Sequence, residues 1–201
     1  MKKILMLLSL GLILAQSVCA TLITFDDLSD AGAGSAIATG YSGFYWDNFR
    51  VLNTGAYEIK PSGYLFGTVS GQNVTYNAWS DPATISRARR FDLNSAFLTA
   101  AWNDGLQVEV VGSFQGAILY DTIYVIDASS PTLVTFNYLG VDSVRFSSTG
   151  GTQRYGMGTH FAMDNLEINT SSAIPEPETW LAGALLLAPL GLSAYWKLRR
   201  A

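Results

Sequence analysis

Four oxygen-bearing side chains fall into two short stretches near the two ends of the central part of the chain. Asp26 and Asp27 close the apolar stretch "LITFDDL", and Asp164 and Asn165 interrupt "FAMDNLEI". We expect the first and last strands of this part to pair, which would bring the four side chains together. Clustered carboxylates repel unless a cation neutralises them, and Ca²⁺ takes about six to eight oxygen ligands. The sequence therefore suggests a structural calcium site here, with turn caps at strand ends as the alternative role.

The second of these stretches also predicts a local irregularity. Phe161 and Met163 share one phase of a strand, and Leu166 and Ile168 share the other. Successive side chains of a strand point to opposite faces, so all four can be buried only if the strand slips by one residue. A β-bulge at Asp164-Asn165 would provide that slip and would re-aim the neighbouring side chains.

Aromatic side chains supply a second kind of candidate site. Exposed rings pack on the C–H faces of sugars, although aromatic residues of β-proteins more often fill the core. The stretch "NVTYNAWSD" is the most suggestive, because its aromatics stand among polar, turn-forming residues. The candidate sugar-binding residues are Trp46, Trp79 and Trp102, together with Tyr57, Tyr64 and Tyr76.

Catalytic patterns are weak. The chain has a single histidine, His160, and no Gly-x-Ser-x-Gly, zinc-binding or phosphate-binding motif. Carboxylate pairs such as Asp104 with Glu109 could hydrolyse glycosides, but nothing distinguishes them among the acidic residues. The sequence therefore predicts a protein that is not an enzyme, and leaves a polysaccharide hydrolase as a minor alternative.

The charge balance of residues 21–170 excludes one class of partner. This part has seven Lys and Arg against fourteen Asp and Glu, a net charge of −7. Nucleic acids are bound mainly through cations that neutralise their phosphates, so nucleic acid is a poor partner. Acidity suits a soluble domain outside the cell and the binding of divalent cations.

The elements that must position these residues are strands. "LQVEVVGSF" alternates apolar and polar residues, as does "DSVRFSS", and "AILYDTIYVI" and "TLVTFNYL" are rich in β-branched and aromatic residues. No segment before Trp180 shows a sustained helical period, and residues 31–43 are predicted to form a long loop. The pattern predicts an all-β domain over residues 21–170, an antiparallel β-sandwich or jelly roll.

The first twenty residues have the pattern of a secretory signal peptide. Lys2 and Lys3 precede an apolar run, and Val18-Cys19-Ala20 suits cleavage by signal peptidase before Thr21. Cys19 is the only cysteine of the chain, so the mature protein would contain none. It would then depend on its core, or on a metal, for stability.

The end of the chain has three parts. Residues 171–179 form a linker that contains Pro175, Glu176 and Pro177, residues 180–196 are uncharged, and residues 197–201 are basic. A helix over 180–196 would span about 25 Å, enough for a thin bilayer. Basic residues stay on the cytoplasmic side, so the sequence predicts a transmembrane helix with the β domain outside.

This three-part order resembles the PEP-CTERM sorting signal of Gram-negative bacteria. The matching residues are Pro175, Glu176 and Pro177, the helix over 180–196, and the Arg199-Arg200 pair. The resemblance implies an exosortase as processing enzyme, an inner-membrane-anchored precursor, and release to the cell surface or the extracellular space in association with exopolysaccharide. "TFDDL", "GLQVEVVGSFQGAILYDTIYVI" and "HFAMDNLEIN" resemble domains found upstream of such signals, and are also similar to jelly-roll carbohydrate-binding modules.

The sequence as a whole thus predicts a non-enzymatic exported protein of the cell surface or biofilm matrix. Its role would be structural or adhesive, in contact with exopolysaccharide. A lectin-like carbohydrate-binding module is the alternative.

Overall fold

Nearly all regular structure between residues 18 and 171 is extended. The computed structural model describes residues 18–171, in which the one α-helix has four residues. In chain order the elements are β1 Val18–Ile23, β2 Ser35–Ala36, η1 Tyr41–Gly43, β3 Tyr45–Asp47, β4 Phe49–Asn53, α1 Gly63–Phe66, β5 Asn73–Asn77, η2 Ala78–Ser80, β6 Ala83–Ala100, β7 Asn103–Asp104, β8 Leu106–Phe114, β9 Ala117–Ile126, β10 Thr132–Thr149, β11 Thr152–Gln153 and β12 Phe161–Ser171. The predicted all-β class is confirmed.

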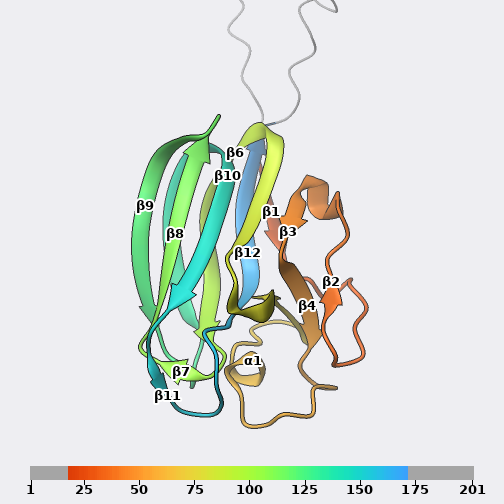
Figure 1. Ribbon diagram of the computed structural model, residues 1–201. Helices are drawn as coiled ribbons and strands as arrows, with labels where there is room; N and C mark the ends of the chain where they lie inside the picture. The colour runs from red at the N-terminus through yellow and green to blue at the C-terminus, as the bar shows by residue number, and fades with distance from the viewer. Residues whose placement is uncertain (1–17, 172–201) are drawn as a thin grey trace, which may run out of the picture. The chain divides into compact units, whose positions relative to one another are not determined.

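Two long strands, β6 and β10, join the two layers of the sandwich. The first half of β10 pairs with β6 from Phe91 to Leu98, and its second half pairs with β6 from Ala83 to Ser86 and also with β8. Register shifts in the middle of β10 mark the bend between the halves. One layer therefore contains β9, β8 and β3 with one half of each long strand, and the other contains β12, β5, β4 and β2 with the other half (Figure 1). The antiparallel, sandwich-like fold is as predicted.

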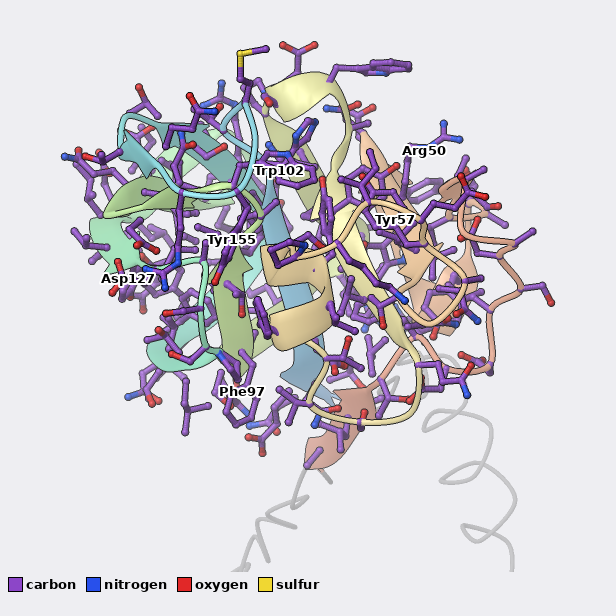
Figure 2. The ribbon with its side chains drawn as sticks, turned by 90° about the horizontal axis from the view of Figure 1, so that it is seen from below. Arg50, Tyr57, Phe97, Trp102, Asp127 and Tyr155 are labelled. Carbon is purple, nitrogen blue, oxygen red and sulfur yellow. The ribbon has the colours of Figure 1, made fainter. Side chains whose placement is uncertain are left out.

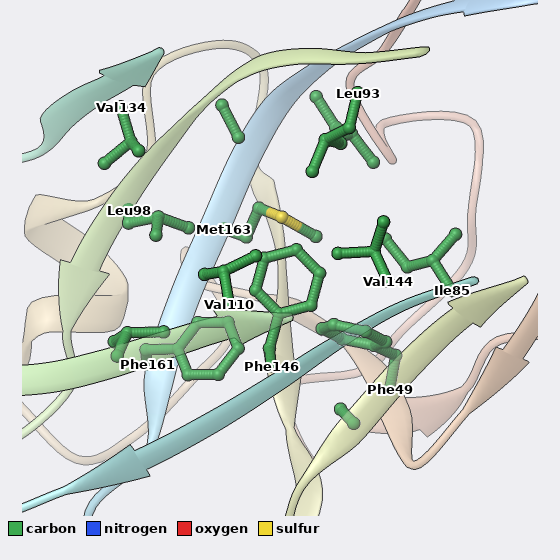
Figure 3. Packing of buried hydrophobic residues seen from close by; sticks show 14 of the residues in the cluster. Phe49, Ile85, Leu93, Leu98, Val110, Val134, Val144, Phe146, Phe161 and Met163 are labelled. Atoms are coloured by element: carbon green, nitrogen blue, oxygen red, sulfur yellow. The ribbon is translucent and has the colours of Figure 1, made fainter. Parts of the chain in front are cut away.

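The core lies between these layers and is centred on Phe146. Its ring is 5.8 Å from Phe49, 5.9 Å from Phe161 and 6.1 Å from Phe136, measured between centroids. Phe146 belongs to the half of β10 that pairs with β8, whereas Phe161 belongs to β12, so these contacts connect the two layers (Figure 3). The contacts with Phe49 and Phe136 are edge-to-face, and such contacts add specific geometry to the burial of large apolar surfaces.

The predicted slip in the last strand is confirmed. Phe161, Met163, Leu166 and Ile168 are all fully buried. The register of β12 against β6 shifts between Asp164 and Glu167, and Asn165, between them, has a φ of +50°. Asparagine tolerates this left-handed region better than most residues, which suits it to the bulge.

The loop predicted over residues 31–43 contains only the two-residue β2 and the 3₁₀ turn η1. β1 also pairs with β12, as expected for the first and last strands.

Several predictions fall outside the described residues. These are most of the signal peptide, the motif of Pro175, Glu176 and Pro177, the helix over 180–196, and the Arg199-Arg200 pair. They remain predictions. Between residues 18 and 171, no helix is long and apolar enough to cross a membrane.

Candidate functional site

A pocket of about 280 Å³ opens at one end of the sandwich, beside α1. Its walls contain six ring-bearing side chains, which are Tyr57, Tyr64, Tyr76, Trp79, Trp102 and His160. Figure 2 views this end of the molecule and shows Tyr57, Trp102 and the further lining residue Arg50. The rings come from loops and strands that are distant in the sequence, so the fold assembles this wall.

Tyr64 is the central ring of the pocket wall. Its buried ring makes edge-to-face contacts with Tyr57 at 5.5 Å, Tyr76 at 5.3 Å and Trp102 at 5.4 Å. The short helix α1 carries Tyr64 and lies directly on the end of β6. Gly63 makes this approach possible, because a Cβ at this position would collide with the backbone carbonyl of Ala100. Burial raises the pKa of Tyr64 well above its ordinary value, so its hydroxyl stays protonated.

Trp102 and His160 form a hydrogen-bonded pair in the same wall. The indole Nε1–H of Trp102 donates to Nδ1 of His160 over 3.2 Å. The proton of the neutral imidazole is therefore on Nε2, which leaves a second donor at the pocket. Burial lowers the pKa of His160, so the ring is neutral at physiological pH. His160 lies in the loop just before β12.

Trp79 is the exposed ring of the pocket. Its side chain is 78% exposed, and its backbone has a φ of +59° within the turn η2. A bulky residue in the left-handed region is a rare outlier and costs about 1–3 kcal/mol. Such strain persists only where the surrounding structure fixes the backbone, and it is concentrated at ligand-binding sites.

The turn that carries Trp79 is fixed from both sides. The side-chain amide of Asn48 donates to the carbonyls of Ala78 at 2.9 Å and Pro82 at 3.1 Å. On the other side, the hydroxyl of Ser80 accepts the backbone N–H of Thr159 at 3.0 Å. These bonds hold an exposed tryptophan in place without burying it.

Arg50 brings a positive charge to the pocket. It lies on β4 directly opposite Tyr76 of β5, and its Nη2 donates to the carbonyl of Gly34. Burial raises the pKa of Tyr76, and the adjacent guanidinium of Arg50 opposes that rise. Sequence reasoning missed Arg50, because only the pairing of β4 with β5 places it beside the aromatic wall.

The structure separates the predicted sugar-binding tryptophans. Trp79 and Trp102 meet at one pocket with all three predicted tyrosines. Trp46 does not join them: it is only 7% exposed, its Nε1–H donates to the carbonyl of Tyr41, and its ring packs against Phe25 and Phe49. Trp46 is thus a core residue rather than an exposed ring, whereas Trp102, which is also 7% exposed, lines the pocket.

Three of the four predicted calcium ligands do come together, around the loop at Ser70. The buried carboxylate of Asp164 accepts the backbone N–H groups of Val69 at 2.7 Å and Ser70 at 3.0 Å. Asp26 accepts those of Gln72 at 2.9 Å and Asn73 at 3.1 Å. Burial raises the pKa of Asp164, although these amide donors oppose the rise.

The other two predicted calcium ligands are Asn165 and Asp27. The side-chain oxygen of Asn165 accepts the hydroxyl of Ser70 at 2.7 Å, whereas Asp27 lies apart and accepts the hydroxyl of Tyr41 at 2.7 Å. Amide and hydroxyl donors thus already occupy the oxygens that a cation would need. In the part of the chain that the structure describes, no group of three or more His, Cys, Asp or Glu could hold a metal ion. These hydrogen bonds fit the alternative role, the capping of turns at strand ends, and a calcium titration distinguishes it from the calcium site suggested by the sequence.

The carboxylate pair considered for hydrolysis has structural partners. Asp104 accepts the backbone N–H of Ala128 at 2.9 Å and forms an ion pair with Arg154 at 2.7 Å. Glu109 accepts the hydroxyl of Ser147 on the neighbouring strand at 3.0 Å. Neither residue lines the aromatic pocket.

No protein-family model and no curated protein matches this chain. Among solved structures, it is similar to a tandem of two family 22 carbohydrate-binding modules from Paenibacillus barcinonensis Xyn10C, with 13% identity and a TM-score of 0.37 over 81% of this chain. This chain covers 48% of that tandem, about half its length. It is also similar to a family 51 module from Clostridium perfringens bound to methyl-galactose, with 13% identity and a TM-score of 0.35 over 74% of this chain and 99% of that one.

Proposed function

We propose that this protein binds carbohydrate in the aromatic pocket and does not transform it. The observation that carries the proposal is the strained and exposed Trp79, which stands at a pocket otherwise walled by Tyr57, Tyr64, Tyr76 and Trp102. An exposed aromatic face at a pocket offers a packing surface to an apolar ligand surface, such as the C–H face of a sugar ring.

The size and chemistry of the pocket fit a small piece of a glycan. Its volume of about 280 Å³ lies just below the range of small-molecule sites, which begins at about 300 Å³. Such sites combine apolar walls with a few placed polar groups. Here the polar groups are the imidazole of His160, the guanidinium of Arg50 and the hydroxyl of Tyr76, which suit the hydroxyl groups of one sugar unit.

Binding without hydrolysis is supported by the lining of the pocket, which contains no Asp or Glu. Glycoside hydrolysis needs a pair of carboxyl groups on either side of the scissile bond. Together with the predicted export signals, carbohydrate binding in this pocket suits a surface or matrix protein that holds exopolysaccharide. This is the lectin-like form of the function expected from the sequence.

The test is a glycan array probed with three purified proteins. Trp79→Gly removes the ring and relieves the positive φ, so we expect at least a tenfold loss of binding with a melting temperature (Tm) equal to or above that of the wild type. Tyr45→Ala is the matched control, because Tyr45 is 58% exposed but lies outside the pocket, and it should bind normally. Unchanged binding by Trp79→Gly, or no glycan bound by the wild type, would overturn the proposal.

A further inference from the structure

Arg50 is a cation without an anionic partner. Its side chain is partly buried and lines the pocket, whose lining contains no carboxylate. Within residues 18–171 the one ion pair joins Arg154 to Asp104, so no acidic side chain lies within ion-pairing distance of Arg50. A partly desolvated charge of this kind costs free energy unless something neutralises it.

Most of the hydrogen-bonding capacity of Arg50 is also unused. A guanidinium has five N–H donors. In this protein one nitrogen of Arg50 donates to the carbonyl of Gly34, and the hydroxyl of Tyr76 lies beside the group. The remaining donors are available to a ligand in the pocket.

The acidic residue closest in sequence to the loop at Gly34 does not serve as the partner. Asp30 accepts the backbone N–H of Gly32 at 2.8 Å, that of Asn53 at 2.9 Å, and the hydroxyl of Ser35 at 2.8 Å. Burial raises the pKa of Asp30, but these hydrogen bonds outweigh the effect and lower it overall. Its carboxylate therefore already accepts hydrogen bonds from Gly32, Ser35 and Asn53, and it forms no ion pair with Arg50.

We propose that the sugar bound in this pocket carries a carboxylate, as a hexuronic acid does, and that the guanidinium of Arg50 binds this carboxylate. The planar fork of a guanidinium matches the two oxygens of a carboxylate, and this charge-assisted pair is among the strongest in proteins. The sugar ring would pack on Trp79 while its acid group reaches Arg50. This inference rests on carbohydrate binding by the pocket.

The ligand class is testable with paired probes. Oligogalacturonate and a glucuronic-acid oligosaccharide are each compared with the same saccharide after its carboxyl groups have been reduced to alcohols. Titration calorimetry with the wild-type protein should show at least one acidic probe bound about tenfold or more tightly than its reduced form. Arg50→Gln should remove this difference, and Arg50→Lys should keep only part of it, because an ammonium group lacks the fork.

Arg89→Gln is the matched control, since Arg89 is an exposed arginine of β6 outside the pocket, and it should leave both affinities unchanged. Equal affinity for acidic and reduced probes, with binding still lost in Trp79→Gly, would overturn the acidic ligand and leave carbohydrate binding intact. An equal effect of Arg89→Gln and Arg50→Gln would overturn it in favour of diffuse electrostatics. Binding of neither form would overturn the acidic ligand, whereas carbohydrate binding itself is overturned only if the glycan array also shows no binding. If Arg50→Gln fails to fold, the comparison of the two probes with the wild type still decides.

Discussion

His160, which accepts a hydrogen bond from Trp102 in the pocket, should make the stability of the folded protein depend on pH. It is the only histidine of the chain, and burial lowers its pKa below the ordinary 6.5. The unfolded chain therefore takes up a proton near pH 6.5, while the folded protein does so only at lower pH. Stability that is complete above pH 6.5 is lost as the pH falls through this window, with a slope below the one-proton limit of about 1.4 kcal/mol per pH unit.

We expect the Tm of the wild type to fall more between pH 7.5 and 5.5 than that of His160→Gln. Glutamine can still accept the indole N–H of Trp102 but does not titrate. Carboxyl groups respond mainly at lower pH, so this window isolates the imidazole. Parallel Tm curves for the two proteins would show that His160 is protonated equally in the folded and unfolded states.

The residues of the site were partly predictable. Trp79 stands among turn-forming residues, a pattern that indicates an exposed ring, and the structure shows it exposed at the pocket. Trp46 could have been excluded by its phase, because it alternates with the exposed Tyr45 and Asp47 and so points inward. Arg50 had no local signal, since its role depends on Tyr76, which is distant in the sequence and adjacent only through strand pairing.

At the scale of elements, the bulge in β12 shows how a sequence pattern can fix a local structure. Two apolar pairs of opposite phase required a slip, and the structure places it at the predicted residues. The bends of β6 and β10 were not predicted. "TLVTFNYL" and "DSVRFSS" read as separate strands, because the register shifts between them interrupt the alternation. Bulges increase the local bend and twist of a strand, which lets β10 pass from one layer to the other.

The bulge also directs Asp164 at the loop containing Val69 and Ser70, and this contact should matter for stability. Asp164→Asn keeps the shape but replaces one oxygen by an NH₂ group, which must face a backbone N–H. Hydrogen bonds to a charged group are worth about 1.5–3 kcal/mol, so we expect the free energy of unfolding to fall by about 2 kcal/mol in urea denaturation. Glu167→Gln is the control on the same strand, where the side chain accepts only the hydroxyl of Ser95.

The same contacts predict the response to calcium. Because backbone N–H groups already donate hydrogen bonds to the carboxylates of Asp164 and Asp26, the Tm of EDTA-treated protein should be the same with and without millimolar calcium chloride. A ligand that binds only the folded state raises Tm. A rise of several degrees that disappears in Asp164→Asn would show instead that the loop at Ser70 opens to let a cation in.

At the scale of the whole domain, β12 connects the pocket to the end of the described chain. It begins at Phe161, directly after His160 of the pocket, and its last residues pair with β6 at Phe91, at the far end of the sandwich (Figure 1). A strand of 11 residues at about 3.3 Å per residue spans roughly 33 Å. The pocket therefore lies at the opposite end of the domain from Ser171, beyond which the predicted linker and membrane segment follow.

This arrangement leads to a prediction about the precursor. If the Pro-Glu-Pro motif is the processing signal, Pro175→Ala with Pro177→Ala should leave the chain uncut in the inner membrane of a host that has an exosortase. The paired variant Ser171→Ala with Ser172→Ala, in the same linker, should be cut normally. Immunoblots of membrane and released fractions measure both, and normal processing of the proline variant would contradict the sorting signal.

The uncut precursor should still bind sugar, because its pocket lies away from the end of the domain at which the predicted linker begins. We expect spheroplasts that carry the proline variant to capture the glycan identified on the array, and the capture to disappear when Trp79→Gly is added. Loss of capture in the proline variant alone would mean that the membrane end of the chain blocks the pocket. Processing would then have to come before sugar binding, because the protein could bind polysaccharide only after its release from the membrane.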